Sequence, residues 1–88
     1  MAWTIEYSET AVKQLAKLDK KTAHDILNYM DERVAVLDNP RITGKTLKGK
    51  LGEFWRYRVG DHRIIVSIKD NALIILVIKI GNRREVYK

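Results

Sequence analysis

The sequence predicts a small α+β domain in which two helices pack on one face of a mostly antiparallel sheet, in the order β-α-α-β-β-β. Three observations predict this class. An alternating strand comes first, two stretches with helical spacing follow, and three strand-like segments joined by short turns fill the second half. With 88 residues, we expect a single domain over residues 1–88.

The first half of the chain predicts one strand and two helices. Residues 2–7 alternate, so Trp3, Ile5 and Tyr7 should share the buried side. Ser8 is expected to cap a first helix, whose apolar positions are Ala11, Val12, Leu15 and Leu18. Asp19 should cap a second, whose stripe is Ala23, Ile26, Leu27, Met30, Val34 and Leu37 and which ends at "DNP", residues 38–40.

The second half predicts a basic loop and three strands. Residues 41–50 carry four cationic side chains and two glycines without apolar periodicity, which is typical of a loop. Strands are expected over residues 53–59, 62–69 and 72–80, with turns at Gly60-Asp61 and Asp70-Asn71. The last strand is almost entirely apolar, so we expect it inside the sheet.

Composition favours a polyanionic partner. Lys and Arg number 17 against 11 Asp and Glu, a formal charge of +6. The chain has no cysteine, which suits a reducing cytoplasm. Its N-terminal segment resembles a strand rather than a signal peptide, and its longest apolar run, residues 73–78, is too short to cross a membrane. We therefore expect a cytoplasmic protein with no membrane partner.

The stretch "WRYRVGDHR", residues 55–63, predicts a hairpin that gathers arginines on one face of the sheet. A two-residue turn at 60–61 sets the register as Val59–His62, Arg58–Arg63, Tyr57–Ile64 and Arg56–Ile65. Arg56, Arg58 and Arg63 then share the face away from the helices, which we call the arginine face.

Like charges placed opposite each other cost a few tenths to about 1 kcal/mol, so an anion is expected there. The alternative is that these are ordinary solvated arginines. The basic loop and the terminal "NRREVYK", residues 82–88, favour an anion-binding groove.

The same register predicts apolar side chains on the arginine face, at Ile65, Ile74, Leu76 and Ile78. This is more apolar surface than a monomer usually exposes. We expect either an acidic amphipathic partner or the C-terminal tail to cover it.

The catalytic inventory is almost entirely cationic. His24 and His62 lack metal-ligand spacing, and no acidic cluster suggests a magnesium site, so no cofactor or metal is expected. His62 should lie opposite the arginine face in a structural role. Cations suit RNA cleavage, because the ribose 2′-hydroxyl is itself the nucleophile and needs only orientation, charge stabilisation and proton transfer. DNA lacks that hydroxyl.

The order of elements, with "DNPR" (38–41), "LKG" (47–49), "FWRYRVGDHRIIVSI" (54–68) and "IGNRREVY" (80–87), resembles the RelE toxins of the RelE/ParE superfamily over nearly the whole chain. The resemblance implies a type II toxin that cuts messenger RNA in the ribosomal A site, without a metal, by 2′-hydroxyl attack. It also implies three partners: a RelB-like antitoxin that blocks the groove, the ribosome, and operator DNA reached only through the antitoxin complex.

The resemblance also implies roles for single residues. Arg56 and Arg58 fall where the family has two lysines, and Arg63 matches a family arginine. Tyr87 matches a tyrosine at the end of the family's chains. The family's arginine after the last strand matches Arg83, or alternatively Arg84. Tyr87 is expected to orient or stack on a nucleotide, or else to close the core. The expected RNA-binding residues are Lys45, Lys48, Lys50 and Arg84.

Arginine effectively never loses its proton, so the general base stays open. The candidates are Lys48, Lys45, a deprotonated Tyr87, or positioning in a desolvated site. Two other functions share the expected fold: a ParE-like toxin that poisons DNA gyrase, and a non-catalytic nucleic-acid-binding module.

Overall fold

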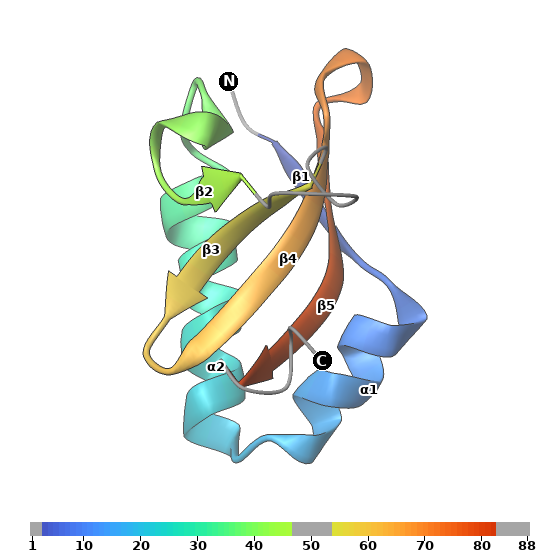
Figure 1. The fold of residues 1–88 in the computed structure, drawn as a ribbon, viewed down its shortest axis with the longest axis vertical. Helices are drawn as coiled ribbons and strands as arrows, with labels where there is room; N and C mark the ends of the chain where they lie inside the picture. The colour runs from blue at the N-terminus through green and yellow to red at the C-terminus, as the bar shows by residue number, and fades with distance from the viewer. Residues whose placement is uncertain (1–2, 47–53, 83–88) are drawn as a thin grey trace.

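The computed structural model describes residues 3–46 and 54–82 (Figure 1). Its elements in chain order are β1 (Thr4–Tyr7), α1 (Glu9–Lys17), α2 (Lys20–Asn28), a π-helical turn (Tyr29–Val34), a 3-10 turn (Pro40–Ile42), β2 (Lys45–Thr46), β3 (Trp55–Val59), β4 (His62–Lys69), a second 3-10 turn (Asp70–Ala72) and β5 (Ile74–Asn82). The predicted α+β class is confirmed.

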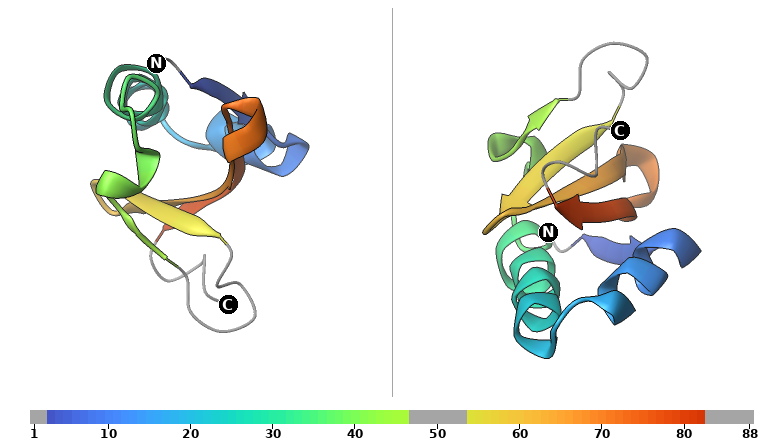
Figure 2. Two further views of the ribbon diagram at one scale, coloured as in Figure 1. Left: turned by 90° about the horizontal axis from the view of Figure 1, so that it is seen from above. Right: turned by 60° about the horizontal axis from the view of Figure 1, so that its bottom comes forward.

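The strands form one sheet in the order β1-β5-β4-β3-β2. β1 runs parallel to β5 and every other pair is antiparallel, so the mostly antiparallel sheet and the interior place of β5 are confirmed. Both helices lie on one side of the sheet, and within the described part of the chain the opposite face carries no helix (Figures 1 and 2). None of the described helices is long and apolar enough to cross a membrane.

Both predicted helix caps are confirmed. The Ser8 hydroxyl accepts from the Ala11 amide at 3.0 Å, and the Asp19 carboxylate accepts from the Thr22 amide at 3.1 Å. The expectation that Val12 packs inward is wrong, because it is 53% exposed. The helix contacts the core through Ala11, Leu15 and Leu18, which lie on one side of it at positions i, i+4 and i+7. Val12 directly follows Ala11 and therefore points to a different side of the helix.

The second predicted helix is not uniform. After α2 ends at Asn28, the Met30 carbonyl accepts from the Ala35 amide, five residues further on, at 2.9 Å. A turn of this kind holds more residues than an α-helical turn. Side chains spaced by four therefore stay in line, and Ile26, Met30 and Val34 are all fully buried.

The predicted hairpin register is confirmed at every position, from Val59 opposite His62 to Arg56 opposite Ile65. Tyr57 and Ile64 are buried in the main core, with Trp55 and Val59 packed against it. The same core takes Trp3 from the N-terminal strand, with Ile5 and Tyr7 against it. The arginine face therefore points away from the helices, as expected.

The loop expected over residues 41–50 is partly ordered into regular structure. Pro40–Ile42 forms a 3-10 turn, and Lys45–Thr46 forms the edge strand β2, which pairs with β3. Such a short edge strand has no apolar alternation of its own and forms only because β3 supplies its hydrogen-bonding partner. Residues 47–50 lie outside the described residues.

The last strand contains a β-bulge that unbroken alternation does not predict. Ile65 pairs with Lys79 and Val66 pairs with Val77, so Ile78 is the extra residue. Alternation resumes out of phase beyond it. Ile80 is therefore buried, and Lys79, which pairs with Ile65, lies on the arginine face.

The apolar surface expected on the arginine face is smaller than predicted. Ile65 is only 5% exposed, because Phe54 packs against it. Ile74, Leu76 and Ile78 are half-buried. Strand alternation predicted that Ile65 lies on the arginine face, but it did not predict that Phe54 packs against it.

The contrast between Ile26 and Val12 is testable. Replacing Ile26 by Val removes one buried methylene, so the free energy of unfolding should fall by about 0.5–1.5 kcal/mol. Val12→Ala removes two exposed methyl groups, and it should change that free energy by less than about 0.5 kcal/mol. Urea denaturation followed by circular dichroism measures both. A larger loss from Val12→Ala than from Ile26→Val would contradict the described packing of α1.

Candidate functional site

A pocket of about 430 Å³ opens where β2, β3 and β4 meet. It is lined by Gly44, Lys45, Arg56, Tyr57, Arg58 and Arg63. Four of these six residues are cationic and none is acidic. We call it the basic pocket.

The strand registers bring the four cations together. Arg58 lies directly opposite Arg63 across β3 and β4, and Arg56 lies opposite Lys45 across β3 and β2. Directly opposed residues share a face of the sheet, with β-carbons about 4.5–5.5 Å apart. The basic pocket therefore follows from two pairings that involve three strands.

The side chain of Arg58 is held toward the hairpin turn. Its Nε donates to the Gly60 carbonyl at 3.1 Å, and Gly60 has a φ of +59°, which a two-residue hairpin turn requires. The residue that shapes the turn thus also supplies the acceptor for one pocket arginine.

The segment that supplies Lys45 is packed tightly against β3. Trp55 Nε1 donates to the Thr43 carbonyl at 2.7 Å. Gly44, with a φ of +83°, lies so close to β3 that a β-carbon there would overlap the Arg56 carbonyl oxygen, and it would also meet the Trp55 and Tyr57 side chains. Only glycine fits at this position.

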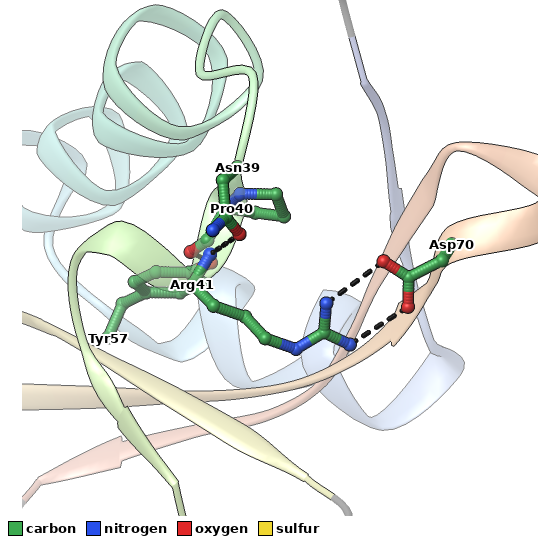
Figure 3. A network of polar contacts seen from close by, with 5 residues as sticks. All are labelled: Asn39, Pro40, Arg41, Tyr57 and Asp70. Atoms are coloured by element: carbon green, nitrogen blue, oxygen red, sulfur yellow. Dashed lines mark hydrogen bonds and ion pairs between the residues drawn. The ribbon is translucent and has the colours of Figure 1, made fainter.

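A second set of contacts fastens the start of that segment (Figure 3). Arg41 makes two parallel hydrogen bonds of 2.9 Å to the carboxylate of Asp70, at the turn between β4 and β5. The Asn39 side chain accepts from the Arg41 amide at 3.0 Å, and the Tyr57 hydroxyl donates to the Pro40 carbonyl. The ends of two distant loops are thereby joined beside the sheet.

The electrostatics of these groups follow from their surroundings. Burial raises the pKa of Tyr57 far above its usual range, so the phenol stays neutral and acts as a donor to Pro40. The hydrogen bonds from Arg41 lower the pKa of the Asp70 carboxyl below its ordinary value of 3.8. Tyr57 therefore lines the basic pocket without serving as its acid or base.

The arrangement suits an anion with several oxygens. Guanidinium groups form paired hydrogen bonds to phosphate and stay charged at all relevant pH values, so they can stabilise added negative charge but cannot accept a proton. Lys45 is the lysine among the described lining residues. Any proton acceptor from the protein must come from it or from outside the described segments.

No described histidine or acidic residue lines the basic pocket, whereas Arg58 also borders a second pocket that Asp25 and Glu32 line. His24 is exposed on α2, and His62 lies on the opposite face of the sheet beside Gln14 and Lys17, where it was predicted. Within residues 3–46 and 54–82 no three His, Asp or Glu side chains lie close enough together to hold a metal ion.

The structure describes four of the nine predicted site residues. Lys45, Arg56, Arg58 and Arg63 come together around the basic pocket. The remaining five lie outside the described residues: Lys48, Lys50, Arg83, Arg84 and Tyr87.

Two residues of this surface, Gly44 and Lys79, are not among the residues predicted from the sequence. A glycine in a loop gives no sign that β3 approaches it. Lys79 did carry a signal, because it is the one charge in an apolar strand and a bulge is the simplest way to bring it out of the core.

Comparison with known families gives one match over almost the whole chain. Residues 5–87 match the family described as the ParE toxin of a type II toxin–antitoxin system. Among curated protein sequences none matches the chain significantly.

Solved structures with the same fold include several toxins. The RelBE2 toxin–antitoxin complex of Mycobacterium tuberculosis matches with a TM-score of 0.85 at 20% identity, over 97% of this chain and 95% of that chain. A mutant of the Escherichia coli toxin RelE in the free state gives 0.77 at 25% identity, over 99% and 92%. The archaeal RelE–RelB complex of Pyrococcus horikoshii gives 0.75 at 26% identity, over 97% and 99%.

The close approach of Gly44 to β3 predicts a large effect of a single methyl group. Gly44→Ala should lower the free energy of unfolding by about 2–4 kcal/mol, because it adds steric overlap to a left-handed backbone. Gly60→Ala is the matched control, since that glycine also has a positive φ but its β-carbon would meet nothing within 4 Å. It should cost about 1–2 kcal/mol. Equal losses in urea denaturation would contradict the tight packing at Gly44.

The Arg41–Asp70 pair predicts a pH-dependent contribution to stability. Because the pKa of Asp70 is lower in the folded state, its contribution is complete above the ordinary value of 3.8 and is lost as the pH falls through the folded-state value. Asp70→Asn should therefore destabilise the protein at neutral pH and have progressively less effect below about pH 4. In an Arg41→Gln background, the same replacement should have little effect at any pH. A constant difference between wild type and Asp70→Asn in urea titrations from pH 7 to 3 would rule out the pair as its cause.

Proposed function

The chain belongs to the RelE/ParE superfamily of toxins from type II toxin–antitoxin systems, and from this membership we propose that it is a ribosome-dependent endoribonuclease. It cuts messenger RNA in the ribosomal A site and so inhibits translation. The observation that supports this proposal most directly is the convergence of Lys45, Arg56, Arg58 and Arg63 on one pocket. A phosphodiester is the biological anion that this set suits best.

In the proposed reaction the ribose 2′-oxygen attacks the adjacent phosphorus in line with the departing 5′-oxygen. The bond from phosphorus to the 2′-oxygen forms as the bond to the 5′-oxygen breaks. The 2′-hydroxyl gives its proton to a base, and the leaving 5′-oxygen gains one. The products are a 2′,3′-cyclic phosphate and a 5′-hydroxyl end.

The arginines act on the charge that develops in this transition state. Arg58 and Arg63, opposed across the hairpin, bind the non-bridging oxygens, and Arg56 binds the phosphate from the β2 side of the pocket. Arg83 adds a further guanidinium from the chain after β5. Because arginines keep their protons, their part is electrostatic and orienting.

Proton transfer and substrate binding fall to the remaining residues. Lys45 lines the pocket and is the first candidate for general base, with Lys48 and Tyr87 as alternatives. Tyr87 orients or stacks on a nucleotide next to the cut. Lys48, Lys50 and Arg84 bind the RNA backbone together with Lys45.

The partners follow from the same proposal. Similar structures from M. tuberculosis, E. coli, P. horikoshii and Methanococcus jannaschii are complexes of RelE with RelB. We expect a RelB-like antitoxin that covers the arginine face, operator DNA bound only through that complex, and a site of action on cytoplasmic ribosomes. No metal takes part in the proposed cleavage.

A second candidate is a ParE-like toxin that poisons DNA gyrase. It is favoured by the family match, whose description names ParE, whereas the structures at 25% and 26% identity are RelE proteins. The basic pocket favours the ribonuclease, since four cationic side chains line it and none of its described lining residues is acidic.

Expression in bacterial cells distinguishes the two toxins. The ribonuclease proposal predicts that induction stops protein synthesis within minutes and that primer extension finds new 5′ ends inside codons of translated messages. Messages whose start codon is removed should stay intact. Intact messages together with accumulating gyrase–DNA cleavage complexes would support the ParE-like function instead.

Arg63 provides the sharpest single-residue test. Arg63→Ala removes a guanidinium that faces the transition state, and it should lower the cleavage rate on programmed ribosomes about 100-fold while the circular dichroism spectrum is unchanged. Lys20→Ala removes one positive charge from an exposed residue on the helix side and should leave the rate within about twofold. Equal rates for the two variants would remove Arg63 from the site.

A further inference from the structure

The bulge in β5 is built by contacts from the start of α1. In a regular strand successive carbonyls point to opposite edges, yet the carbonyls of Val77 and Ile78 both accept hydrogen bonds from Ser8. The Ser8 amide reaches Val77 at 2.8 Å, and the Ser8 hydroxyl reaches Ile78 at 2.7 Å. Ser8 therefore satisfies the extra carbonyl that the bulge creates.

A second side chain of the same helix completes the arrangement. The Gln14 side-chain oxygen accepts from the Ile80 amide at 2.6 Å, across 66 residues of sequence. β1 ends at Tyr7, opposite Val77, so within residues 3–46 and 54–82 no strand pairs with that edge of β5 beyond this point. Ser8 and Gln14 take the place of the missing strand on both sides of Lys79.

The bulge decides which side of the sheet Lys79 faces. Lys79 pairs with Ile65, which in turn pairs with Arg56, and Arg56 pairs with Lys45. These four residues form one row across β2, β3, β4 and β5 on the arginine face. With strands about 4.8 Å apart, Lys79 lies two strands, or about 10 Å, from Arg56.

We propose that Lys79 is a further RNA-binding residue, which holds a phosphate next to the one in the basic pocket, and that Ser8 and Gln14 are the residues that position it. The proposal rests on the proposed ribonuclease function and extends its site across β5. Lys79 does not line the basic pocket, so it contributes to binding rather than to the chemical step.

The first experiment separates binding from chemistry. Cleavage of messenger RNA on programmed ribosomes is measured in single turnover against toxin concentration. Lys79→Ala should raise the half-saturating concentration about five- to tenfold and leave the saturating rate within twofold, and Lys79→Arg should restore binding. Lys20→Ala, which removes one charge from the helix side, is the matched control and should match wild type. A Lys79→Ala curve that overlays both would overturn the proposal.

The second experiment tests the positioning role of α1. Gln14→Glu keeps an acceptor for the Ile80 amide, whereas Gln14→Leu removes it. Gln14→Leu should raise the half-saturating concentration as Lys79→Ala does, with no further increase in the double variant, and Gln14→Glu should stay near wild type. Additive effects of the two changes would show that Gln14 does not act through Lys79.

A measurement without cleavage keeps this inference separate from the proposed function. Fluorescence anisotropy of a labelled single-stranded RNA measures the binding constant at several salt concentrations. Lys79→Ala should lose one phosphate contact, so the slope of the logarithm of the binding constant against the logarithm of salt concentration should become shallower by about 0.7. If wild-type protein does not cleave, the proposed function fails, and this salt dependence still decides the role of Lys79. If wild-type protein neither cleaves nor binds RNA, both proposals fall.

Discussion

The register of the β3–β4 hairpin is the constraint on which the site depends. The same two-residue turn that places Arg58 opposite Arg63 places Tyr57 opposite Ile64 on the other face. A slip by one residue would expose that buried pair and send the arginines into the core. Burial of a side chain such as Ile64 or Val66 is worth about 1.5–3 kcal/mol, against at most about 1 kcal/mol for opposed like charges. Packing under the helices therefore enforces the cluster of cations on the outer face.

Lys45, the fourth cation of the basic pocket, is held in place by different interactions. Lys45 belongs to a segment, residues 41–46, in which no side chain is buried, so local contacts hold it in place. The Gly44 approach to β3, the Trp55 bond to Thr43 and the Arg41–Asp70 pair act at successive points along it. The arginines are thus positioned by the core, whereas this lysine is positioned by hydrogen bonds and close backbone contact.

The parts of this structure that the sequence predicts are those governed by neighbours in the chain. A glycine turn and strict alternation determine the hairpin register. Ser8 and Asp19 each cap a helix by accepting a hydrogen bond from the backbone amide three residues further along the chain. The bulge was not predictable in this way, because its acceptors and donors are satisfied by Ser8 and Gln14 from the far end of the chain.

The remaining differences have the same origin. The edge strand β2 exists because β3 lies beside it. The π-helical turn keeps Met30 and Val34 buried in the core, and the local sequence does not show the sheet against which they pack. Of the candidate site, strand alternation predicted the three arginines of one hairpin. Gly44 depends on the close approach of β3, which the sequence does not show, and Lys79 depends on a bulge that its single charge in an apolar strand only indicates.

We propose that the arginine face, which the hairpin register builds, promotes cleavage of RNA by the 2′-hydroxyl of the RNA itself. The most direct measurement replaces the nucleotide at the cleavage position of a ribosome-bound message with its 2′-deoxy counterpart and analyses the fragments after incubation with the purified protein. We predict that the all-ribose message is cut to a 2′,3′-cyclic phosphate and a 5′-hydroxyl, while the substituted message survives at that position. Cleavage of the 2′-deoxy message at the same bond, or product ends with a 5′-phosphate, would contradict it.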